Sequence, residues 1–321
     1  MEKRICGPQL FGNESDTFVA CCAKSPIGQS LNMFFPKSEA GPAHVLSRRR
    51  TSSVSRHSVS CCGKVFVALL AIGLSSLNAV AELKPQTMAA YQKYISELET
   101  KISRQNQSAG DFLWVNGDPV RFQTVRDGKI ASEHKDTADV PGGMIQHWIG
   151  AIFMPGATLR RIVAIDQDYA DYAKFYGPEI SRPKVISHDG DHFVVSYRIT
   201  KTKVLTAVED TVHAIDYLPL QPNRMAVRSR STSVNQVEDA GTSSERVLPV
   251  GEGSGFLWAM NSDWRMEEKD GGVYVECEAV TLSRDVPFGL GGMIDPILQS
   301  FAEESLKKTL NAKRVAVNAA K

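Results

Sequence analysis

Residues 165–199 read IDQDYADYAKFYGPEISRPKVISHDGDHFVVSYRI, and this stretch decides the fold. Its first part, Gln167 to Tyr176, is predicted to be a helix, because the Gly-Pro pair that follows is a helix-stop signal. Lys184 to Ser187 and Phe193 to Thr200 flank Asp189-Gly190, which is typical of a hairpin turn between two strands. The stretch therefore predicts a short helix that leads into an antiparallel hairpin.

The segments on both sides complete this pattern. Met144 to Phe153 is predicted to be a strand, and Thr158 caps a short helix after it. Beyond the hairpin the chain has the character of strands only, with a second Asp-Gly turn at 270–271. The further strands are predicted at Val204 to Ile215, Met225 to Val237, Phe256 to Glu268 and Val273 to Leu282. Helices segregated from a run of strands indicate an α+β fold.

A long C-terminal helix, predicted to open at Asp295-Pro296, completes the fold. Its core-facing side chains recur every three to four residues, so the helix has one stripe to bury. The predicted members of this stripe are Ile294, Leu298, Phe301, Ser305, Thr309 and Ala312. We expect the helix to bury them against the concave face of a curved antiparallel sheet.

This order of elements resembles the START-like, or polyketide cyclase-like, superfamily (SRPBCC). The matching residues are Asp168, Tyr169, Tyr172, Phe175, Tyr176 and Pro178, together with the loop at 283–287. The resemblance covers roughly Gly143 to Arg314. It implies a helix-grip fold, a curved sheet wrapped around a long helix with a cavity between them. Members of the superfamily bind lipids, sterols or polyketides, and a minority are enzymes whose catalytic positions vary, so no catalytic residue is transferred to this chain.

The segment before that domain is predicted to be an N-terminal extension, residues 82–140. Thr87 to Ile102 has the apolar period of a helix. Phe112 to Val115 and Val120 to Ile130 are predicted to be short strands of a hairpin. Ala131 to Val140 is interpreted as a charged linker that ends at Pro141-Gly142-Gly143. The helix-grip domain is then expected to occupy residues 141–321.

Residues 61–81 have the composition of a signal peptide. Lys64 precedes the apolar run VFVALLAIGL at 65–74, and Ala79-Val80-Ala81 forms a small-x-small cleavage pattern. A buried core helix is the alternative interpretation of the same run. Cleavage near Ala81 predicts a periplasmic or secreted protein. Residues 1–60 are then expected to be a disordered or non-native extension.

Charge and cysteine usage narrow the class of partner. The 240 residues after Ala81 carry 32 acidic and 28 basic side chains, so nothing in the charge favours nucleic acid. Five of the six cysteines precede Ala81, and only Cys277 follows it. The exported part is therefore expected to hold its core by packing, without an internal disulfide.

The hairpin turns predict which side chains share a face of the sheet. An Asp270-Gly271 turn pairs Trp264 with Cys277 and turns both toward the cavity. It turns Glu276 and Glu278 outward, beside Arg265, on a face expected to be solvated. In the same way, the first hairpin is expected to point Phe193 and Tyr197 inward and Arg198 outward.

From this register we predict that the pocket is lined by His147, Tyr172, Phe193, Tyr197, Trp258, Met260, Trp264 and Cys277. Such a lining is expected to enclose a hydrophobic or amphipathic small molecule, and membrane contact through lipid exchange would accompany carriage of a lipid. Two alternatives stay open. One is a cyclase- or hydrolase-type enzyme that uses His147 or Tyr197 as acid or base in this pocket. The other is a structural or interaction module with a filled core.

Other residue patterns suggest chemistry more weakly. His188-Asp189-Gly190-Asp191-His192 contains metal-ligand residue types, but a hairpin turn at its centre would send the two histidines to opposite faces. Glu276 and Glu278 could form an acid/base pair, although their expected face is solvated. We therefore predict no catalytic residue, no metal and no cofactor.

Overall fold

The computed structural model describes residues 82–202, 206–284 and 291–319. The predicted signal peptide at 61–81 and the extension at 1–60 lie outside these ranges, so both stay predictions. No helix within the described ranges is long and apolar enough to cross a membrane.

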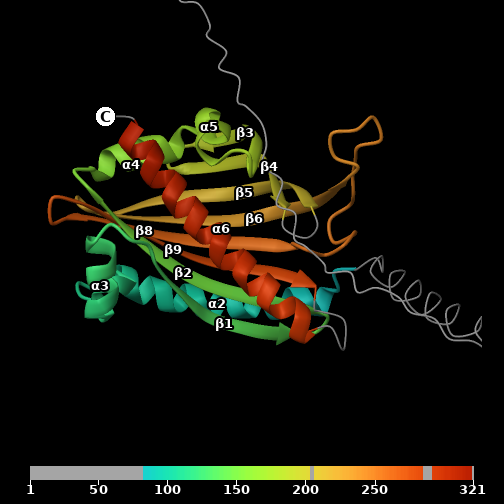
Figure 1. Ribbon diagram of the computed structural model, residues 1–321, viewed down its shortest axis with the longest axis horizontal. Coiled ribbons are helices and arrows are strands. Elements are labelled where there is room, and N and C mark those ends of the chain that lie inside the picture. Colours follow the sequence, from blue (N-terminus) through green and yellow to red (C-terminus); the bar gives the residue numbers. More distant parts are fainter. Residues whose placement is uncertain (1–81, 203–205, 285–290, 320–321) are drawn as a thin grey trace, which may run out of the picture. The chain divides into compact units, whose positions relative to one another are not determined.

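Nine strands in the described ranges form one antiparallel sheet, in the spatial order β1-β2-β9-β8-β6-β5-β4-β3, with β7 beside β6 (Figure 1). Their bounds are β1 Ala131–Val140, β2 Gly143–Pro155, β3 Ile180–Asp189, β4 His192–Thr202, β5 Thr206–Gln221, β6 Arg224–Glu238, β7 Arg246–Val247, β8 Ala259–Lys269 and β9 Gly272–Arg284. Most neighbours in sequence are also neighbours in space. The exceptions are β8, which pairs with β6, and β2, which pairs with β9 along its whole length and thereby brings the first and last parts of the sheet together.

The long C-terminal helix α6, Gly291–Ala319, crosses one face of this sheet, which we call the concave face (Figure 1). Gly150 of β2 lies directly beneath it. A Cβ atom at Gly150 would lie 2.9 Å from Leu310 Cδ1 and 3.0 Å from Leu306 Cδ2, so the missing side chain lets the helix approach the sheet. The predicted helix-grip arrangement is confirmed by this contact and by the strand order.

The predicted details of α6 need correction. The helix begins at Gly291, four residues before the expected cap at Asp295. Its buried side chains in the described part are Leu306, Leu310, Lys313, Ala316 and Val317, one position after the expected Ser305, Thr309 and Ala312. The predicted stripe contained the small residues Ser305, Thr309 and Ala312 and did not include the buried Lys313.

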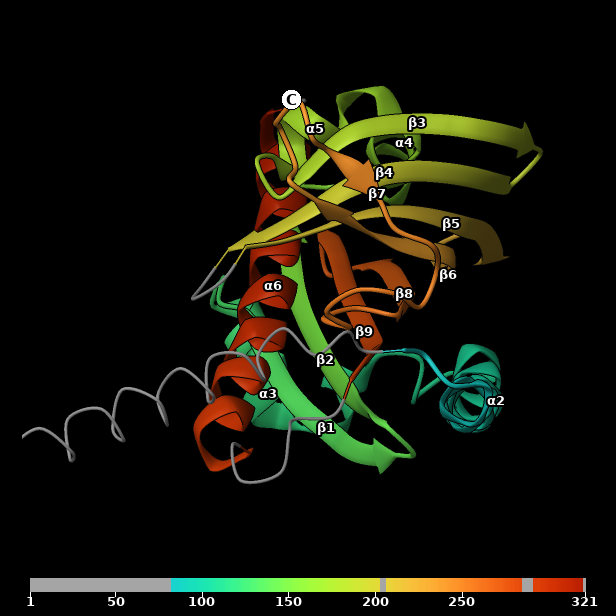
Figure 2. The ribbon, with the colours of Figure 1, turned by 90° about the vertical axis from the view of Figure 1, so that its right-hand side faces the viewer.

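A second long helix, α2, Pro85–Gln107, covers the opposite face of the sheet, which we call the convex face. Figure 2 shows α2 and α6 on opposite sides of β2 and β9. Tyr91, Ile95, Leu98 and Ile102 are the buried stripe of α2, as predicted, and they form one cluster with Val280 and Leu282 of β9 and neighbouring side chains. Both faces of the central strands are therefore covered.

The hairpin predicted at 112–130 is wrong. The chain there forms the 3₁₀ helix η2, Trp114–Gly117, and the α-helix α3, Pro119–Arg126. The Asp118 side chain accepts hydrogen bonds from the backbone N–H groups of Val120 and Arg121, and Pro119 occupies the first turn. An acidic cap followed by proline is a helix start, and this local signal outweighs the β-propensity of the following residues.

The charged linker predicted at 131–140 is also wrong, because this segment is the edge strand β1. It pairs with β2 from Ala131 to Val140, and Pro141-Gly142 forms the turn between the two strands. The expected domain boundary therefore falls inside a hairpin. Charged side chains are typical of edge strands, where one side is open to water.

The region between β2 and β4 follows the prediction in part, because the helix expected from Gln167 to Tyr176 is divided at Asp168 into a 3₁₀ turn and a shorter helix. Thr158 caps α4, Leu159–Gln167, and accepts a hydrogen bond from the N–H of Arg161. The 3₁₀ turn η3, Tyr169–Asp171, and the short helix α5, Tyr172–Tyr176, then lead into the β3–β4 hairpin. Asp189 pairs with His192, so the turn residues are Gly190 and Asp191, one position later than expected.

Candidate functional site

The strand register places one set of aromatic and sulfur-containing side chains on the concave face. Trp264 of β8 pairs with Cys277 of β9, which confirms the predicted register. The Asp270-Gly271 turn that sets this register has φ values of 55° and 75°, as a two-residue hairpin turn requires. Burial raises the pKa of the Cys277 thiol far above its ordinary value, so this cysteine stays protonated and unreactive.

The predicted site residues divide between the two faces. Those that lie on or against the concave side are Tyr172, Phe193, Tyr197, Met260, Trp264 and Cys277. Their role as ligand contacts stays a prediction. His147 and Trp258 lie on the convex side instead, where His147 contacts Glu278 and Trp258 packs in the cluster beneath α2. The run at 144–153 is apolar almost throughout, so its sequence could not show which way His147 points.

Burial along β8 differs between its two sides. Met260, Ser262 and Trp264, which face α6, are only half-buried. Asn261, Asp263 and Arg265, which face α2, are buried. Side chains of nearby strands on the same face are half-buried as well, namely Tyr197, Ser229, Ser231, Ala279 and Thr281. We call this set, together with Met260, Ser262 and Trp264, the open strip. Its partial exposure shows that the middle of the concave face keeps accessible surface.

A buried ion pair borders the open strip. Asp166 at the end of α4 contacts Lys313 of α6, and both side chains are less than a tenth exposed. The Lys313 ammonium also lies 4.3 Å from the centre of the Trp264 ring, a cation–π contact. Burial raises the pKa of Asp166, while the charge of Lys313 acts in the opposite direction. The pair joins α4 and α6 at one end of the concave face.

Three tyrosine hydroxyls surround the same aspartate. Tyr172 and Tyr217 donate hydrogen bonds of 2.8 and 3.0 Å to the backbone carbonyl of Asp166. Because the single Tyr217 hydrogen is used in this bond, Tyr169 donates to the Tyr217 oxygen, 3.0 Å away. Burial raises the pKa of each hydroxyl, so all three remain protonated donors.

His213 of β5 supplies an unpaired polar atom next to the open strip. Its ring stacks on Tyr197 with centroids 4.8 Å apart, and its Nδ1 lies 3.3 Å from the Ser229 hydroxyl. Burial lowers the pKa of His213 to about 4, so the imidazole is neutral near pH 7. Its Nε2 atom has no hydrogen-bond partner among the described residues. The indole N–H of Trp148, on the same face of β2, lacks one too.

Glu209 lies four residues before His213 on the same side of β5 and is 3% exposed. Burial raises the pKa of Glu209 to about 7, while the charge of Lys201 acts in the opposite direction. The folded-state pKa of Glu209 lies above its ordinary value. The contribution of Glu209 to the free energy of unfolding is therefore largest below about pH 4 and is lost as the pH rises through 7. We expect Glu209→Gln to raise the free energy of unfolding at pH 8 by about 1–3 kcal/mol and to leave it nearly unchanged at pH 4.

Urea denaturation of both proteins between pH 4 and pH 8 measures this difference. Asp210→Asn is the matched control, because Asp210 lies on the other side of the strand and its carboxylate is paired with Arg198 at 2.7 Å. A stability curve for Glu209→Gln that is parallel to that of wild type over the whole pH range would contradict the raised pKa of Glu209.

Comparison of structures finds weak similarities, whereas comparison of sequences finds no relative. No family model matches the chain, and no curated protein matches it significantly. The protein TTHA0849 from Thermus thermophilus is 13% identical over 54% of this chain and 97% of its own, with a TM-score of 0.39. The Zhui aromatase/cyclase from Streptomyces sp. R1128 is 12% identical over 54% and 94%, with a TM-score of 0.38. Human STARD10 is 12% identical over 61% and 79%, with a TM-score of 0.37.

The chain has a helix-grip fold, an antiparallel sheet with a long C-terminal helix across one face. The assignment rests on the strand order and on α6 across the concave face. At these identities the similarity concerns the fold alone, so the ligand has to be argued from the chain's own residues. In this helix-grip fold the open strip lies on the face of the sheet that α6 crosses, and Lys313 of α6 contacts Trp264 there.

The convex face of the sheet is not solvated at Glu276 and Glu278, contrary to the prediction. Glu276 and Glu278 are 0% and 2% exposed. Glu276 accepts hydrogen bonds of 2.8 and 2.9 Å from the backbone N–H groups of Trp114 and Val115 at the start of η2. Arg265 lies between the two carboxylates, 3.6 Å from Glu276 Oε2 and 3.1 Å from Glu278 Oε2. The segment at 82–126 covers these charges, and the strand pattern alone could not reveal that cover.

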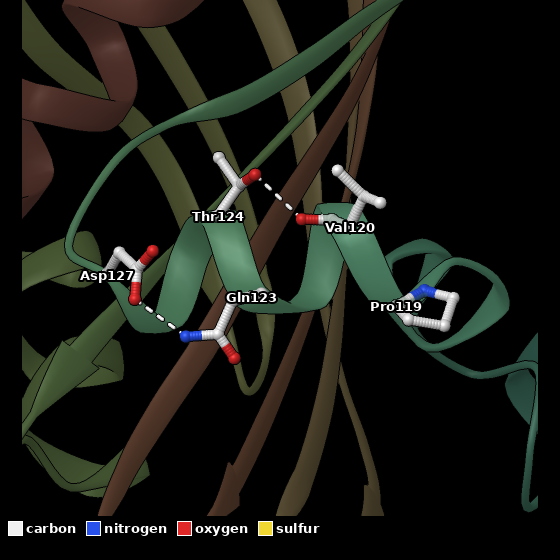
Figure 3. Close-up of a pocket in the computed structure, with 5 residues that line it drawn as sticks. All are labelled: Pro119, Val120, Gln123, Thr124 and Asp127. Carbon is white, nitrogen blue, oxygen red and sulfur yellow. Dashed lines mark hydrogen bonds between the residues drawn. The ribbon is translucent and has the colours of Figure 1, made fainter.

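Two hollows of the described surface lie away from the open strip. One, of about 380 Å³, is lined by side chains of α3 and the residue that follows it (Figure 3). Its polar groups are satisfied locally, since Thr124 donates to the Val120 carbonyl and Gln123 donates to Asp127. The other, of about 320 Å³, lies between α2 and β1 and includes His147.

The histidines of the 188–192 segment do not meet. His188 Nε2 contacts the carbonyl of Gly190, and His192 Nδ1 lies 2.7 Å from Asp216. Within the ranges the structure describes, no group of three or more His, Cys, Asp or Glu side chains could hold a metal ion.

Several residues at the concave site escaped the sequence prediction. Asp166 and Lys313 come together from α4 and α6, and Trp148 and Glu209 face the strip from β2 and β5. One signal was available in the sequence. Leu306, Leu310, Lys313 and Val317 follow helical spacing, and a lysine within an apolar stripe indicates a buried partner.

Proposed function

We propose that this protein binds one amphipathic small molecule between the open strip and α6. The observation that carries the proposal is the reversed burial of β8. Its concave side keeps accessible surface at Met260 and Trp264, while its convex side is closed. Large apolar side chains that remain half-buried on the inside of a sheet favour an apolar occupant, because contact with that occupant would remove them from water.

The polar groups beside the strip favour a ligand with one polar end. The Nε2 atom of His213 and the indole N–H of Trp148 are buried without partners among the described residues, and an unpaired buried polar atom costs about 1–3 kcal/mol. A hydroxyl, keto or carboxylic acid group at one end of a ligand could satisfy the Nε2 atom of His213, whereas Trp148 lies on β2, beyond β6, β8 and β9. Burial raises the pKa of Glu209 to about 7, so this carboxyl is partly protonated near pH 7 and would favour an uncharged polar end near it.

Tryptophan fluorescence tests the proposal. The purified chain is titrated with a medium-chain fatty acid, and the emission of Trp264 is expected to change on binding. Trp264→Phe should lose this change. Trp258→Phe should keep it, because Trp258 lies in the cluster beneath α2 on the other face of the sheet. Equal responses of the two variants would contradict a concave-face site.

A filling substitution separates an open site from a filled core. Ala279 is half-buried in the open strip, opposite Ser262. If the strip is open, Ala279→Phe should abolish probe binding and leave the free energy of unfolding nearly unchanged. If the core is filled, overpacking should lower that free energy by about 1–3 kcal/mol. The second result, together with no binding by wild type, would favour the structural-module alternative.

Export is the second part of the proposed function. The apolar run at 65–74 and the Ala79-Val80-Ala81 pattern support a cleaved leader. N-terminal sequencing of exported material is expected to begin at Glu82. A mature product that begins upstream of the apolar run would contradict this part and would leave the binding proposal unaffected.

A further inference from the structure

A hydroxyl, an imidazole and a carboxylate form a continuous chain on the convex face, outside the proposed ligand site. Tyr94 Oη of α2 lies 2.8 Å from His147 Nδ1 of β2. His147 Nε2 lies 2.9 Å from Glu278 Oε1 of β9. The side chains of His147 and Glu278 are 5% and 2% exposed. The elements that hold these groups come from distant parts of the sequence, and the pairing of β2 with β9 fixes two of them side by side.

The surroundings set the direction of the hydrogen bonds. Burial alone would raise the pKa of Glu278, but the hydrogen bond from His147 and the charge of Arg265 bring it below its ordinary value. Glu278 is therefore ionised and accepts the Nε2–H of His147. An imidazole whose one proton is on Nε2 presents its Nδ1 lone pair to the Tyr94 hydroxyl. Asp136 Oδ2 is the competing acceptor, but it is farther from Tyr94 Oη, at 3.3 Å.

This arrangement has the roles found in nucleophilic catalysis. A hydroxyl contacts a base, and a buried carboxylate orients that base and stabilises its protonated form. Burial and the charge of Asp136 raise the pKa of Tyr94, so its hydroxyl stays protonated until a base removes the proton during attack. Tyr94 is thus comparable to a catalytic serine, which is likewise un-ionised at rest.

Tyr94 and His147 line the hollow of about 320 Å³ between α2 and β1. A bulge in β1 shapes its wall, because the pairing skips Lys135 and sets Asp136 opposite His147. Bulges often re-aim side chains in this way. The hollow is large enough for a small organic molecule.

Two lysines and two acidic side chains, Glu97 and Asp136, line this hollow. Lys101 and Lys135 both line it, and Lys135 also pairs with Glu133 at 2.6 Å. The charge of Lys101 reaches Glu278, where it helps to lower the pKa of that carboxylate. An ammonium group near an attacked carbonyl stabilises the oxyanion that forms there.

We propose that this hollow is an acyl-transfer site that hydrolyses small carboxylic esters, with Tyr94 as nucleophile, His147 as general base and Glu278 as its positioning residue. Tyr94 Oη bonds to the ester carbonyl carbon while its proton passes to His147 Nδ1. The carbon–oxygen bond to the alcohol breaks, and His147 returns the proton to the leaving alkoxide. Water then attacks the acyl-tyrosine and gives a proton to His147, which passes it to the departing Tyr94 oxygen. The carboxylic acid is released, and the chain is restored.

The test uses the full chain and p-nitrophenyl acetate. Wild type is expected to release p-nitrophenolate and to carry a transient acetyl group on Tyr94, located by peptide mass spectrometry after acid quenching. Tyr94→Phe and His147→Asn should each lower the rate by about a hundredfold. Tyr274→Phe is the matched control and should keep the wild-type rate, because the Tyr274 hydroxyl contacts Asp270 and lies outside the chain of three groups.

Each outcome bears on the proposal. Acetyl-tyrosine at position 94 in wild type supports it without any variant. Acetylation confined to lysines, or a Tyr94→Phe rate within about twofold of wild type, would overturn it. Circular dichroism of the variants shows whether a lost rate reflects the missing group or a lost fold.

Discussion

Replacing Arg265 by leucine is expected to lower the free energy of unfolding by about 3–5 kcal/mol. Arg265 is 1% exposed and lies between the buried carboxylates of Glu276 and Glu278. Its removal leaves two negative charges close together in a site that α2 and η2 close off from water. Breaking one partner of a buried charge cluster costs far more than breaking a surface pair, because the remaining charges cannot be solvated.

The pH dependence of this loss provides a second readout. Without Arg265 the folded-state pKa values of Glu276 and Glu278 should rise. Protonation then favours the folded state, so the deficit of Arg265→Leu should shrink as the pH falls from 8 toward 5. Arg182→Leu is the control. The side chain of Arg182 is 61% exposed in its pair with Glu245, and its loss should cost less than about 1 kcal/mol at every pH. If Arg265→Leu also lowered the free energy of unfolding by less than about 1 kcal/mol, water would have to reach the carboxylates of Glu276 and Glu278.

The second large effect is expected at the Asp166–Lys313 pair beside the open strip. Asp166→Leu leaves the Lys313 ammonium buried against the Trp264 ring without its counter-ion. We expect the free energy of unfolding to fall by about 3–5 kcal/mol. The double variant Asp166→Leu/Lys313→Met removes both charges and keeps similar volume, so it should recover most of this loss.

Urea denaturation of the wild type, both single variants and the double variant measures the coupling between the two residues. Lys308→Met serves as control, since Lys308 pairs with Glu179 at the surface with 59% of its side chain exposed. Additive losses in the double variant would show that Asp166 and Lys313 act independently. The double variant also removes a charged group from the site where a hydrophobic ligand is proposed, so it is expected to bind fatty acid at least as tightly as wild type.

Both predictions depend on the burial of charge on the two faces of the same sheet. The cluster around Arg265 joins the segment at 82–126 to the sheet, and the Asp166–Lys313 pair joins α4 to α6. Charged residues are rarely buried unless they are paired. In this chain the pairs connect elements that lie far apart in the sequence, so they form only when the whole fold is in place.

The sequence by itself determined the features that depend on local chemistry. The Thr158 cap, the Asp270-Gly271 turn and the apolar period of α2 each act over a few residues, and each is found in the structure as predicted. Strand alternation then determined that Trp264 and Cys277 share a face. The order of short helices and antiparallel strands predicted an α+β fold, and the family resemblance implied its helix-grip arrangement.

Only the tertiary structure decided what covers each face. Alternation shows that Glu276 and Glu278 share a side of β9, but it does not show that α2 and η2 bury that side, because the covering segment lies more than 150 residues earlier in the chain. The same limit applies to His147, which lies in a strand buried on both sides and therefore has no polar alternation to orient it. Contacts between distant segments place Tyr94 beside His147 and Lys313 beside Asp166. The physical reason is that a side chain's own neighbours fix its direction, whereas its burial and charge state depend on whichever distant element packs against it.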